Sequence, residues 1–357
     1  MLLPAWATAR VAPTHFMNRQ SLLFTAPGCV EVRAEPLPPP ETGEVVVQTL
    51  ASAISSGTEM LVYHGQAPTE LAVDETISAL GGTFSFPLKY GYAAVGRVAD
   101  LGPGVDPDWQ GRLVFAFNPH ESRFISPVAN LLSLPADIDP ETALCLSNME
   151  TAVNFLLDGA PLIGEQVAVF GQGIVGLLTA ALLARLPLAS LITLDRYPRR
   201  REASLSLGAH ASLDPSAPDA LAQLQSHLQA DRSYAGADLT YELSGAPAAL
   251  DVALAATGFN GRVVVGSWYG QKRADLNLGG RFHRSRIRLI SSQVSTLTPE
   301  LMGRWTKSRR LQVAWHMLRA IKPARLITHR FPLAEAAQAY ALIDQHPDQC
   351  IQVILTY

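Results

Sequence analysis

The pattern of apolar and polar residues changes near residue 150. Before that point, residues 20–135 hold short apolar runs between Gly- and Pro-rich turns such as LPPPETG and LGPG. Three of these runs have the length and the β-branched content of strands, namely residues 44–49, 93–98 and 112–117. This part of the chain therefore predicts a β module with irregular loops.

Beyond residue 150, segments typical of strands and of helices alternate. We expect strands over 167–170, 191–194, 238–243, 262–266 and 286–291. The helices expected between the first of them cover 174–186 and 199–207. Such alternation predicts an α/β fold with a parallel sheet, because parallel neighbours need a crossover connection. A helical region around 299–320 and a strand over 351–355 follow.

Composition narrows the class of protein. The chain has 357 residues, of which 48% are hydrophobic and 17% charged, which fits two domains and excludes global disorder. A net charge of −3 gives no basic excess for nucleic acid. Three scattered cysteines argue against disulfides and a structural zinc lobe, and favour a cytoplasmic setting. We expect no membrane span and no signal peptide.

The strongest motif is GQGIVG at residues 171–176, between an expected strand and an expected helix. In this context Gly171 permits a tight turn, Gly173 lets a pyrophosphate approach the backbone, and Gly176 allows close packing of helix on strand. Ile174 and Val175 open the helix, whose N–H groups can hold the phosphates. The alternative is a glycine-rich turn in another α/β fold.

Asp195 ends the next expected strand and favours NAD, since a carboxylate there can accept hydrogen bonds from the ribose hydroxyls and repels a 2′-phosphate. Arginines follow at once, and Arg is the usual partner of phosphate. We therefore include Arg196 and Arg200 among the cofactor-binding candidates and keep NADP as the alternative. The alternative for these arginines is that they lie at the solvated start of a helix.

With these motifs, the chain resembles the medium-chain dehydrogenase/reductase superfamily of the zinc alcohol dehydrogenase type. SGTE at 56–59 with YHG at 63–65, and GYAAVG at 91–96, are similar to two of its signature segments. Within it, segments such as AISSGTEMLVYHGQAP and FPLKYGYAAVGRV resemble the bacteriochlorophyllide dehydrogenase-like group. The resemblance implies a GroES-like β domain and a doubly wound Rossmann domain with a six-stranded parallel sheet.

The implied domain boundaries follow from that resemblance. We expect an N-terminal extension over 1–18, a GroES-like catalytic domain over 19–150, a Rossmann domain over 151–292 and a return to the catalytic domain over 293–357. The family also implies a homodimer, with residues 286–294 as the candidate edge strand.

The departures from the family pattern concern the metal. Where relatives supply zinc ligands, this chain has Ser56, Tyr92, Ala93 and Ser147, and Cys145 lies two residues away without visible partners. Zinc prefers thiolate, imidazole and carboxylate ligands. We therefore predict an enzyme without zinc.

Four residues are candidates to replace the metal as electrophile or proton donor, namely Tyr92, Thr58, Ser56 and Glu150. Each has a structural alternative. Tyr92 can fill the space that the metal leaves, and Thr58 can cap a helix. Ser56 can hold a water molecule, and Glu150 can place a negative charge at a helix N-terminus.

Other polar residues near these segments are expected to be structural. We expect Glu59 to pair with an arginine near the cofactor, and His64 and His120 to be surface or loop residues. Of the cluster at Arg304, Arg309 and Arg310, most should lie on a solvated helix face.

Three further residues are expected near the cofactor. The resemblance implies a nicotinamide contact for Thr151. Ser267 and Trp268 follow an expected strand, and such loops face the cofactor crevice; packing under the loop is the alternative for Trp268.

The predicted function is hydride transfer between NAD(P) and a secondary alcohol or ketone on a small, ring-bearing molecule. The alternatives are reduction of an activated C=C bond and a redox sensor that binds dinucleotide without catalysis.

Overall fold

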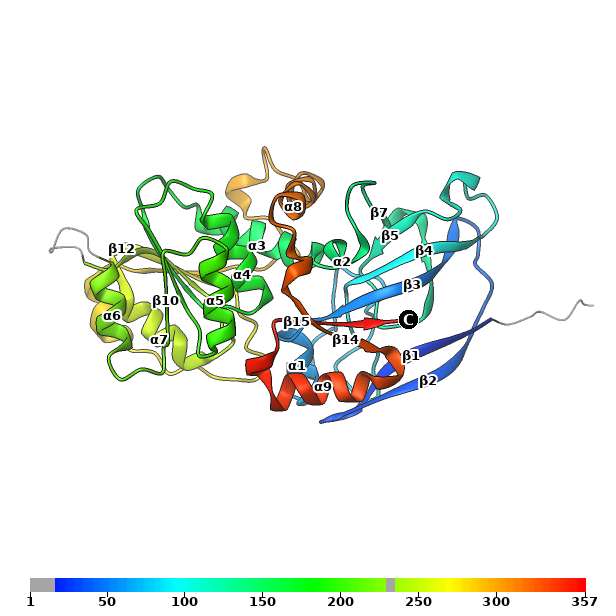
Figure 1. Cartoon of the computed structure of the whole chain (residues 1–357), viewed down its shortest axis with the longest axis horizontal. Coiled ribbons are helices and arrows are strands. Elements are labelled where there is room, and N and C mark those ends of the chain that lie inside the picture. The colour runs from blue at the N-terminus through cyan, green and yellow to red at the C-terminus, as the bar shows by residue number, and fades with distance from the viewer. Residues whose placement is uncertain (1–16, 229–234) are drawn as a thin grey trace, which may run out of the picture.

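The computed structural model of the protein describes residues 17–228 and 235–357. Two lobes lie side by side, one with a sheet flanked by helices and one built mostly of strands (Figure 1). Of the extension expected over 1–18, residues 1–16 lie outside the described residues, and Met17 and Asn18 begin β1 (Met17–Ala26).

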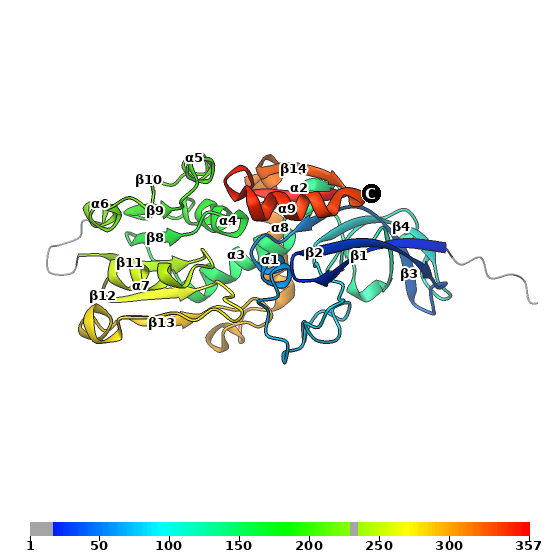
Figure 2. The ribbon, with the colours of Figure 1, turned by 90° about the horizontal axis from the view of Figure 1, so that it is seen from below.

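The predicted parallel sheet is confirmed. Its six strands are β8 (Gln166–Phe170), β9 (Ser190–Leu194), β10 (Ala211–Leu213), β11 (Ala237–Glu242), β12 (Thr257–Val265) and β13 (Arg288–Ser291). They pair in the order β10-β9-β8-β11-β12-β13, and each neighbouring pair is parallel. Figure 2 shows this order down the lobe. The chain starts in the middle and winds to both edges, so the strand order reverses between β8 and β11, as in a Rossmann fold.

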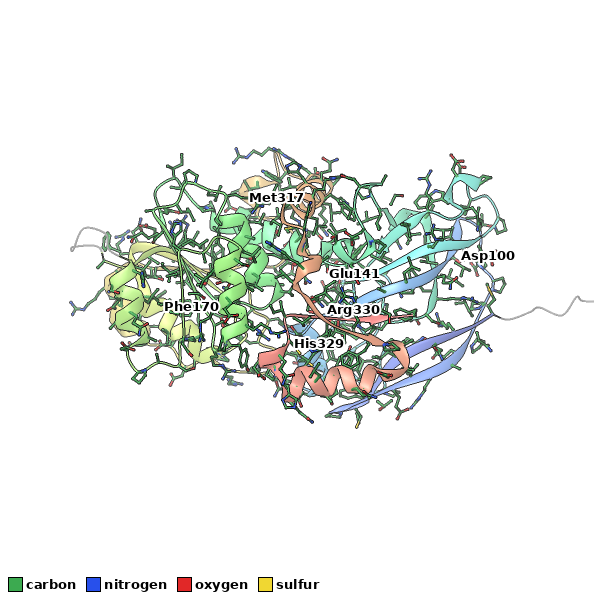
Figure 3. All side chains as sticks on the ribbon, in the orientation of Figure 1. Asp100, Glu141, Phe170, Met317, His329 and Arg330 are labelled. Carbon is green, nitrogen blue, oxygen red and sulfur yellow. The ribbon has the colours of Figure 1, made fainter. Side chains whose placement is uncertain are left out.

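Helices cover both faces of this sheet because successive strand residues point to opposite sides and both sides are apolar. On one face, α3 (Leu146–Gly159) and α4 (Ile174–Leu183) pack with Val167 and Val169, and α5 (Pro198–Ser206) lies beside α4. On the other face, α6 (Ala220–His227) and α7 (Pro247–Ala256) pack with Ala168 and Phe170. Figure 3 labels Phe170, which ends β8.

The second lobe is built around β3 (Glu44–Ile54). Its sheet has the order β14-β15-β3-β4-β5-β7, and one further strand, β6, pairs with β3. These strands are β4 (Ala94–Leu101), β5 (Leu113–Ala116), β6 (Arg123–Pro127), β7 (Leu132–Ser133), β14 (Ile327–Pro332) and β15 (Gln352–Thr356). The three strands predicted in this half are therefore present, with shifted ends.

The C-terminal segment returns to this lobe. β15 pairs antiparallel with β3, with Val353 opposite Ile54. A hairpin of β1 and β2 (Cys29–Leu37), which the apolar pattern did not predict, packs near α9 (Ala336–Gln345). The remaining short helices are α1 (Thr58–Tyr63) and α2 (Pro140–Ala143).

The helix expected around 299–320 is shorter than predicted. Pro299 opens only a 3₁₀ turn that ends at Leu301, and the α-helix that follows is α8 (Lys307–Ile321). Thr306 caps α8, because its side chain accepts a hydrogen bond from the backbone N–H of Arg309. No helix among the described residues is long and apolar enough to cross a membrane.

One buried side chain joins α8 to the parallel-sheet lobe. The Arg310 guanidinium donates from Nε and Nη2 to Oε1 of Glu150 in α3, at 3.0 and 2.8 Å, and from Nη1 to Asn154 Oδ1 at 2.6 Å. Its other two N–H groups reach the carbonyls of Val294 and Thr296. All five donors are thus used.

Arg310 is only 1% exposed, so the prediction of a solvated helix face is wrong for this residue. It holds for Arg309, which is exposed on α8, whereas Arg304 is exposed in the turn before that helix. The side-chain partners of Arg310 on α3 lie 160 and 156 residues away in the sequence, and the two carbonyls after β13 lie 16 and 14 residues before it.

We expect Arg310→Met to lower the free energy of unfolding by about 3–5 kcal/mol, because it leaves the Glu150 carboxylate buried without its partner. Adding Glu150→Gln should recover part of that loss. Urea unfolding followed by circular dichroism measures both effects.

The matched control is Arg330→Met. Arg330 of β14 makes a bidentate pair with Glu141 of α2 at 2.7 Å, but both side chains are well exposed (Figure 3). Exposed pairs contribute little. Equal losses for the two arginine variants would contradict the stabilising role assigned to the buried pair.

Candidate functional site

The glycine turn between β8 and α4 has the geometry of a phosphate cradle. Gly171 has φ +89°, and a Cβ there would lie 2.5 Å from Ser244 Cα. A Cβ on Gly176 would lie 1.9 Å from the carbonyl oxygen of Gly171, so close packing of the helix requires glycine. Around Gly173, by contrast, a Cβ would meet no atom within 4 Å. The turn is therefore open at the point where a pyrophosphate must approach the helix.

Ile174 and Val175 form the first turn of α4, as expected. Its N-terminus carries the partial positive charge of the helix dipole, which favours a phosphate. The residues present thus fit the dinucleotide that the motif implies.

Asp195 follows the end of β9 and is 7% exposed. Its carboxylate accepts hydrogen bonds from the backbone N–H of Gln172 at 2.7 Å and of Tyr197 at 2.9 Å. The acid is therefore fixed against the glycine turn, which is the position from which a ribose is recognised.

The arginines after Asp195 are mostly engaged within the chain. Arg200 donates to the carbonyls of Cys350 and Pro347 at 3.1 and 3.0 Å, and its Nη1 lies 3.9 Å from Asp195 Oδ2. Arg201 donates to the carbonyl of Asp195. Arg196 is exposed and lies over the ring of Tyr197. Of these three, Arg196 has the fewest contacts with the rest of the chain.

The loop after β12 lies against the end of β11 and the loop that follows it, because neighbouring parallel strands end at the same edge of the sheet. Ser267 Oγ accepts from Gly245 N at 2.9 Å. Trp268 is 36% exposed, and its ring centroid is 5.6 Å from that of Phe84 in the other lobe. Gln271 N donates to Gln66 O at 2.9 Å, so this loop bridges the two lobes.

Glu242 is a site residue that the sequence analysis missed. It ends β11, is fully buried, and accepts hydrogen bonds from Ser244 N at 2.8 Å and from the hydroxyls of Ser244 and Tyr269. Burial and this carboxylate raise the pKa of Tyr269. An acidic residue at the end of a central apolar strand was the signal that could have identified it.

The predicted catalytic hydroxyls Tyr92 and Thr58 lie together in the other lobe. β3 pairs antiparallel with β4, with Ser52 opposite Ala94, so the chain after β3 and the chain before β4 leave the sheet at the same edge. Tyr92 OH donates to Ser55 Oγ and, at 3.4 Å, to Thr58 Oγ1. Ser55 is a further residue that the motif comparison missed.

Burial raises the pKa of Tyr92, so its phenol stays protonated and remains a hydrogen-bond donor near neutral pH. Aromatic rings continue from it toward the other lobe. The ring centroids of Tyr92 and Tyr90 are 6.1 Å apart, and those of Tyr90 and Phe84 are 5.8 Å apart. With Trp268, these rings form a continuous row, the aromatic row, between the lobes.

The positions of the family's zinc ligands do not fit zinc. Among residues 17–228 and 235–357, no three His, Cys, Asp or Glu side chains lie close enough together to hold a metal ion. Cys145 is fully buried, and burial raises the pKa of its thiol to about 12, whereas zinc binds a thiolate. Ser147 is buried, and its Oγ has no hydrogen-bond partner among the residues that the structure describes.

The acidic candidates have other partners. Glu150 is bound by Arg310. Burial raises the pKa of Glu150, and the guanidinium opposes that shift.

Glu59 pairs with His120 at 3.0 Å and accepts a hydrogen bond from the Tyr340 hydroxyl, so the prediction of an arginine partner for Glu59 is wrong. His120 is fully buried, which corrects its expected surface position; His64 is exposed, as expected, and contacts Asp344.

Thr151 and Ser56 have no interaction that assigns them a role. Thr151 Oγ1 donates to the carbonyl of Ser147, one turn earlier in α3, at 2.9 Å. Ser56 lies half-buried between β3 and α1. The cofactor contact expected for Thr151 and the catalytic role expected for Ser56 stay predictions.

Comparison with known families supports the assignment of the fold. Residues 175–307 match a family described as zinc-binding dehydrogenase. The match covers the parallel-sheet lobe beyond the start of α4 and stops at the first residue of α8.

Two curated relatives cover almost the whole chain. The 2-desacetyl-2-hydroxyethyl bacteriochlorophyllide A dehydrogenase of Rhodobacter capsulatus is 26% identical over 358 residues, 96% of this chain and 99% of the relative. The D-guloside 3-dehydrogenase of Escherichia coli K12 is 23% identical over 329 residues, 88% and 93% of the two chains. The two substrates differ widely, so the likeness leaves the substrate open.

Among solved structures, one from Escherichia coli CFT073, described as a short chain alcohol dehydrogenase complexed with cofactor NADH, superimposes with a TM-score of 0.76 at 19% identity. The superposition covers 95% of this chain and 99% of that one. With the doubly wound sheet and the glycine turn, the family match and the curated dehydrogenases support a place for the chain in the medium-chain dehydrogenase/reductase superfamily of nicotinamide-dependent oxidoreductases.

Proposed function

We propose that this protein is a zinc-independent, NAD-dependent oxidoreductase that interconverts a secondary alcohol and a ketone. The observation that carries the proposal is the Tyr92 phenol, which lies beside Ser55 and Thr58 at a position where relatives hold a metal ligand. A protonated phenol supplies what carbonyl reduction needs at the substrate oxygen, namely a hydrogen-bond donor.

A nicotinamide, when bound, would supply a hydride to the carbonyl carbon or accept one from the alcohol carbon. On reduction, the Tyr92 phenol gives its one proton to the substrate oxygen and takes up another from solvent; on oxidation, both transfers run in reverse. While the phenol donates to the substrate, Ser55 and Thr58 donate to the phenolic oxygen. Ser55 and Thr58 orient the phenol, and Ser56 and Ser147 hold water in the space that zinc fills in relatives. We assign Glu150 to the ion pair with Arg310 rather than to proton transfer, since Arg310 stabilises its charged form.

NAD is the proposed cofactor because Asp195 carries a buried negative charge at the ribose position. The engagement of Arg200 and Arg201 with backbone carbonyls leaves them less free to bind a 2′-phosphate. Gly171, Gly173, Gly176 and the first residues of α4 are proposed to hold the pyrophosphate, and Thr151, Ser267 and Trp268 to border the nicotinamide.

A ring-bearing substrate fits the aromatic row. The row leads from the phenol of Tyr92 through the buried rings of Tyr90 and Phe84 to Trp268, which is 36% exposed, and stacking on an exposed aromatic ring favours a flat or cyclic substrate. We also propose a homodimer through β13, an edge strand whose Leu289 is 42% exposed, and domain boundaries near 150 and 292.

Tyr92→Phe should lower kcat by about 100-fold or more and leave the Kd for NAD unchanged, because it removes the proton donor and keeps the ring. Steady-state kinetics with a panel of cyclic alcohols, ketones and enones measures this effect. Tyr63→Phe, the same change on α1 at a ring stacked on Tyr340, is the control. Full activity of Tyr92→Phe would rule out the proposed role, and turnover of enones alone would favour a C=C reductase.

Asp195→Asn should weaken NAD binding by about 10-fold, the loss expected for a hydrogen bond to a charged group, and weaken NADP binding less. Isothermal titration of both cofactors measures the two affinities. Tighter binding of NADP than of NAD by the unmodified protein would overturn the cofactor assignment.

Removal of metal should leave the activity unchanged. The protein should contain far less than one zinc per chain after dialysis, and a chelator such as 1,10-phenanthroline should not inhibit it, because its hydroxyl and alkyl side chains are poor zinc ligands. Mass spectrometry of metals measures the content. Stoichiometric zinc whose removal abolishes turnover would contradict the zinc-independent proposal.

A further inference from the structure

A fully buried pair of ionisable side chains, Glu59 and His120, lies beneath the Tyr92 segment. Both residues are 0% exposed, and His120 Nε2 is 3.0 Å from Glu59 Oε2. A charged or polar pair in such surroundings is costly unless every group has a partner. The partners of this pair therefore indicate what it holds in place.

Glu59 holds the segment that carries the hydroxyls. Its Oε1 accepts a hydrogen bond from the backbone N–H of Ser55 at 2.8 Å, and its Oε2 also accepts from the Tyr340 hydroxyl. Glu59 lies in the first turn of α1, directly after Thr58. The carboxylate thus fixes Ser55, and the residue that carries it adjoins Thr58; these are the two residues that hydrogen-bond the phenol.

His120 supports the segment that carries the phenol itself. Gly91 has φ +116°, and a Cβ on it would lie 2.7 Å from His120 Nε2. The imidazole therefore packs directly against the backbone that precedes Tyr92. The backbone N–H of His120 also donates to Tyr90 O at 3.4 Å.

The outer nitrogen of His120 is held as well. Nδ1 lies 2.6 Å from Ser52 Oγ, which in turn lies 2.7 Å from the Tyr357 hydroxyl. With both ring nitrogens bound, the imidazole has one orientation. One end of this network thus contacts the segments that carry Ser55 and Tyr92. The other end is held by Ser52 of β3 and by Tyr357, just beyond β15.

We infer that Glu59 and His120 are positioning residues that fix the Tyr92 phenol against Ser55 and Thr58. This inference rests on the proposed function of Tyr92. The pair acts on geometry and does not relay protons to the phenol, since its link to Ser55 is a backbone N–H. A displacement of about 1 Å at a catalytic group costs on the order of 100-fold in rate.

The test compares His120→Leu with His120→Gln in the full-length protein. His120→Leu removes both hydrogen bonds and should lower kcat by about 10- to 100-fold with the Kd for NAD unchanged. His120→Gln keeps an amide donor near Glu59 and should retain more of the activity. His329→Leu, at a half-buried histidine of β14 that stacks on Phe331, should keep the activity of the unmodified protein.

A second measurement reads the position of the phenol without turnover. In protein labelled with ¹³C at tyrosine Cζ, the Tyr92 resonance is assigned by its loss in Tyr92→Phe. His120→Leu should shift or broaden it, and His329→Leu should not. An unmoved resonance together with unchanged kcat in the folded His120→Leu protein would overturn the inference.

The two proposals fail in different ways. If Tyr92→Phe is fully active, the proposed role of Tyr92 fails, and a shifted resonance in His120→Leu still supports positioning. If Tyr92→Phe is impaired, His120→Leu should add little further loss in that background, because both changes act through one hydroxyl. Independent, multiplying losses would show that His120 acts elsewhere.

Discussion

The buried guanidinium of Arg310 is the contact that ties the C-terminal segment to the parallel-sheet lobe. It binds α3 through Glu150 and Asn154, and it binds the segment after β13 through two carbonyls. The chain leaves the parallel sheet at that segment and continues through α8 to β14 and β15. Five hydrogen bonds at one planar group therefore hold the start of α8, from which the chain returns to β14 and β15.

Local constraints explain the features that could be predicted from the sequence. The glycine turn at 171–176 was recognisable because its requirements, a positive φ and two close backbone approaches, depend on neighbouring residues. The four central strands β9, β8, β11 and β12 were recognisable because their residues are apolar on both faces, whereas the edge strand β10 was not predicted. Asp195 was found because it ends the strand that follows the turn and its helix.

Features that depend on distant partners could not be predicted. His120 looks like a loop histidine until Glu59, 61 residues away, and Ser52, 68 residues away, bind its two ring nitrogens. Arg310 follows an exposed Arg309 and differs from it only in what the fold brings against it. The motif comparison located Tyr92 and Thr58 but missed Ser55, because hydrogen bonding rather than residue type places Ser55 at the phenol.

The pairing of β15 with β3 has a consequence for folding. Gln352 Nε2 donates to Ile54 O across 298 residues of chain, and most of the parallel-sheet lobe lies between the two. During synthesis, β3 therefore leaves the ribosome long before the strand that covers its edge. The intervening lobe has mostly nearer contacts and can fold first, while the β lobe exposes an unpaired strand edge until synthesis is almost finished.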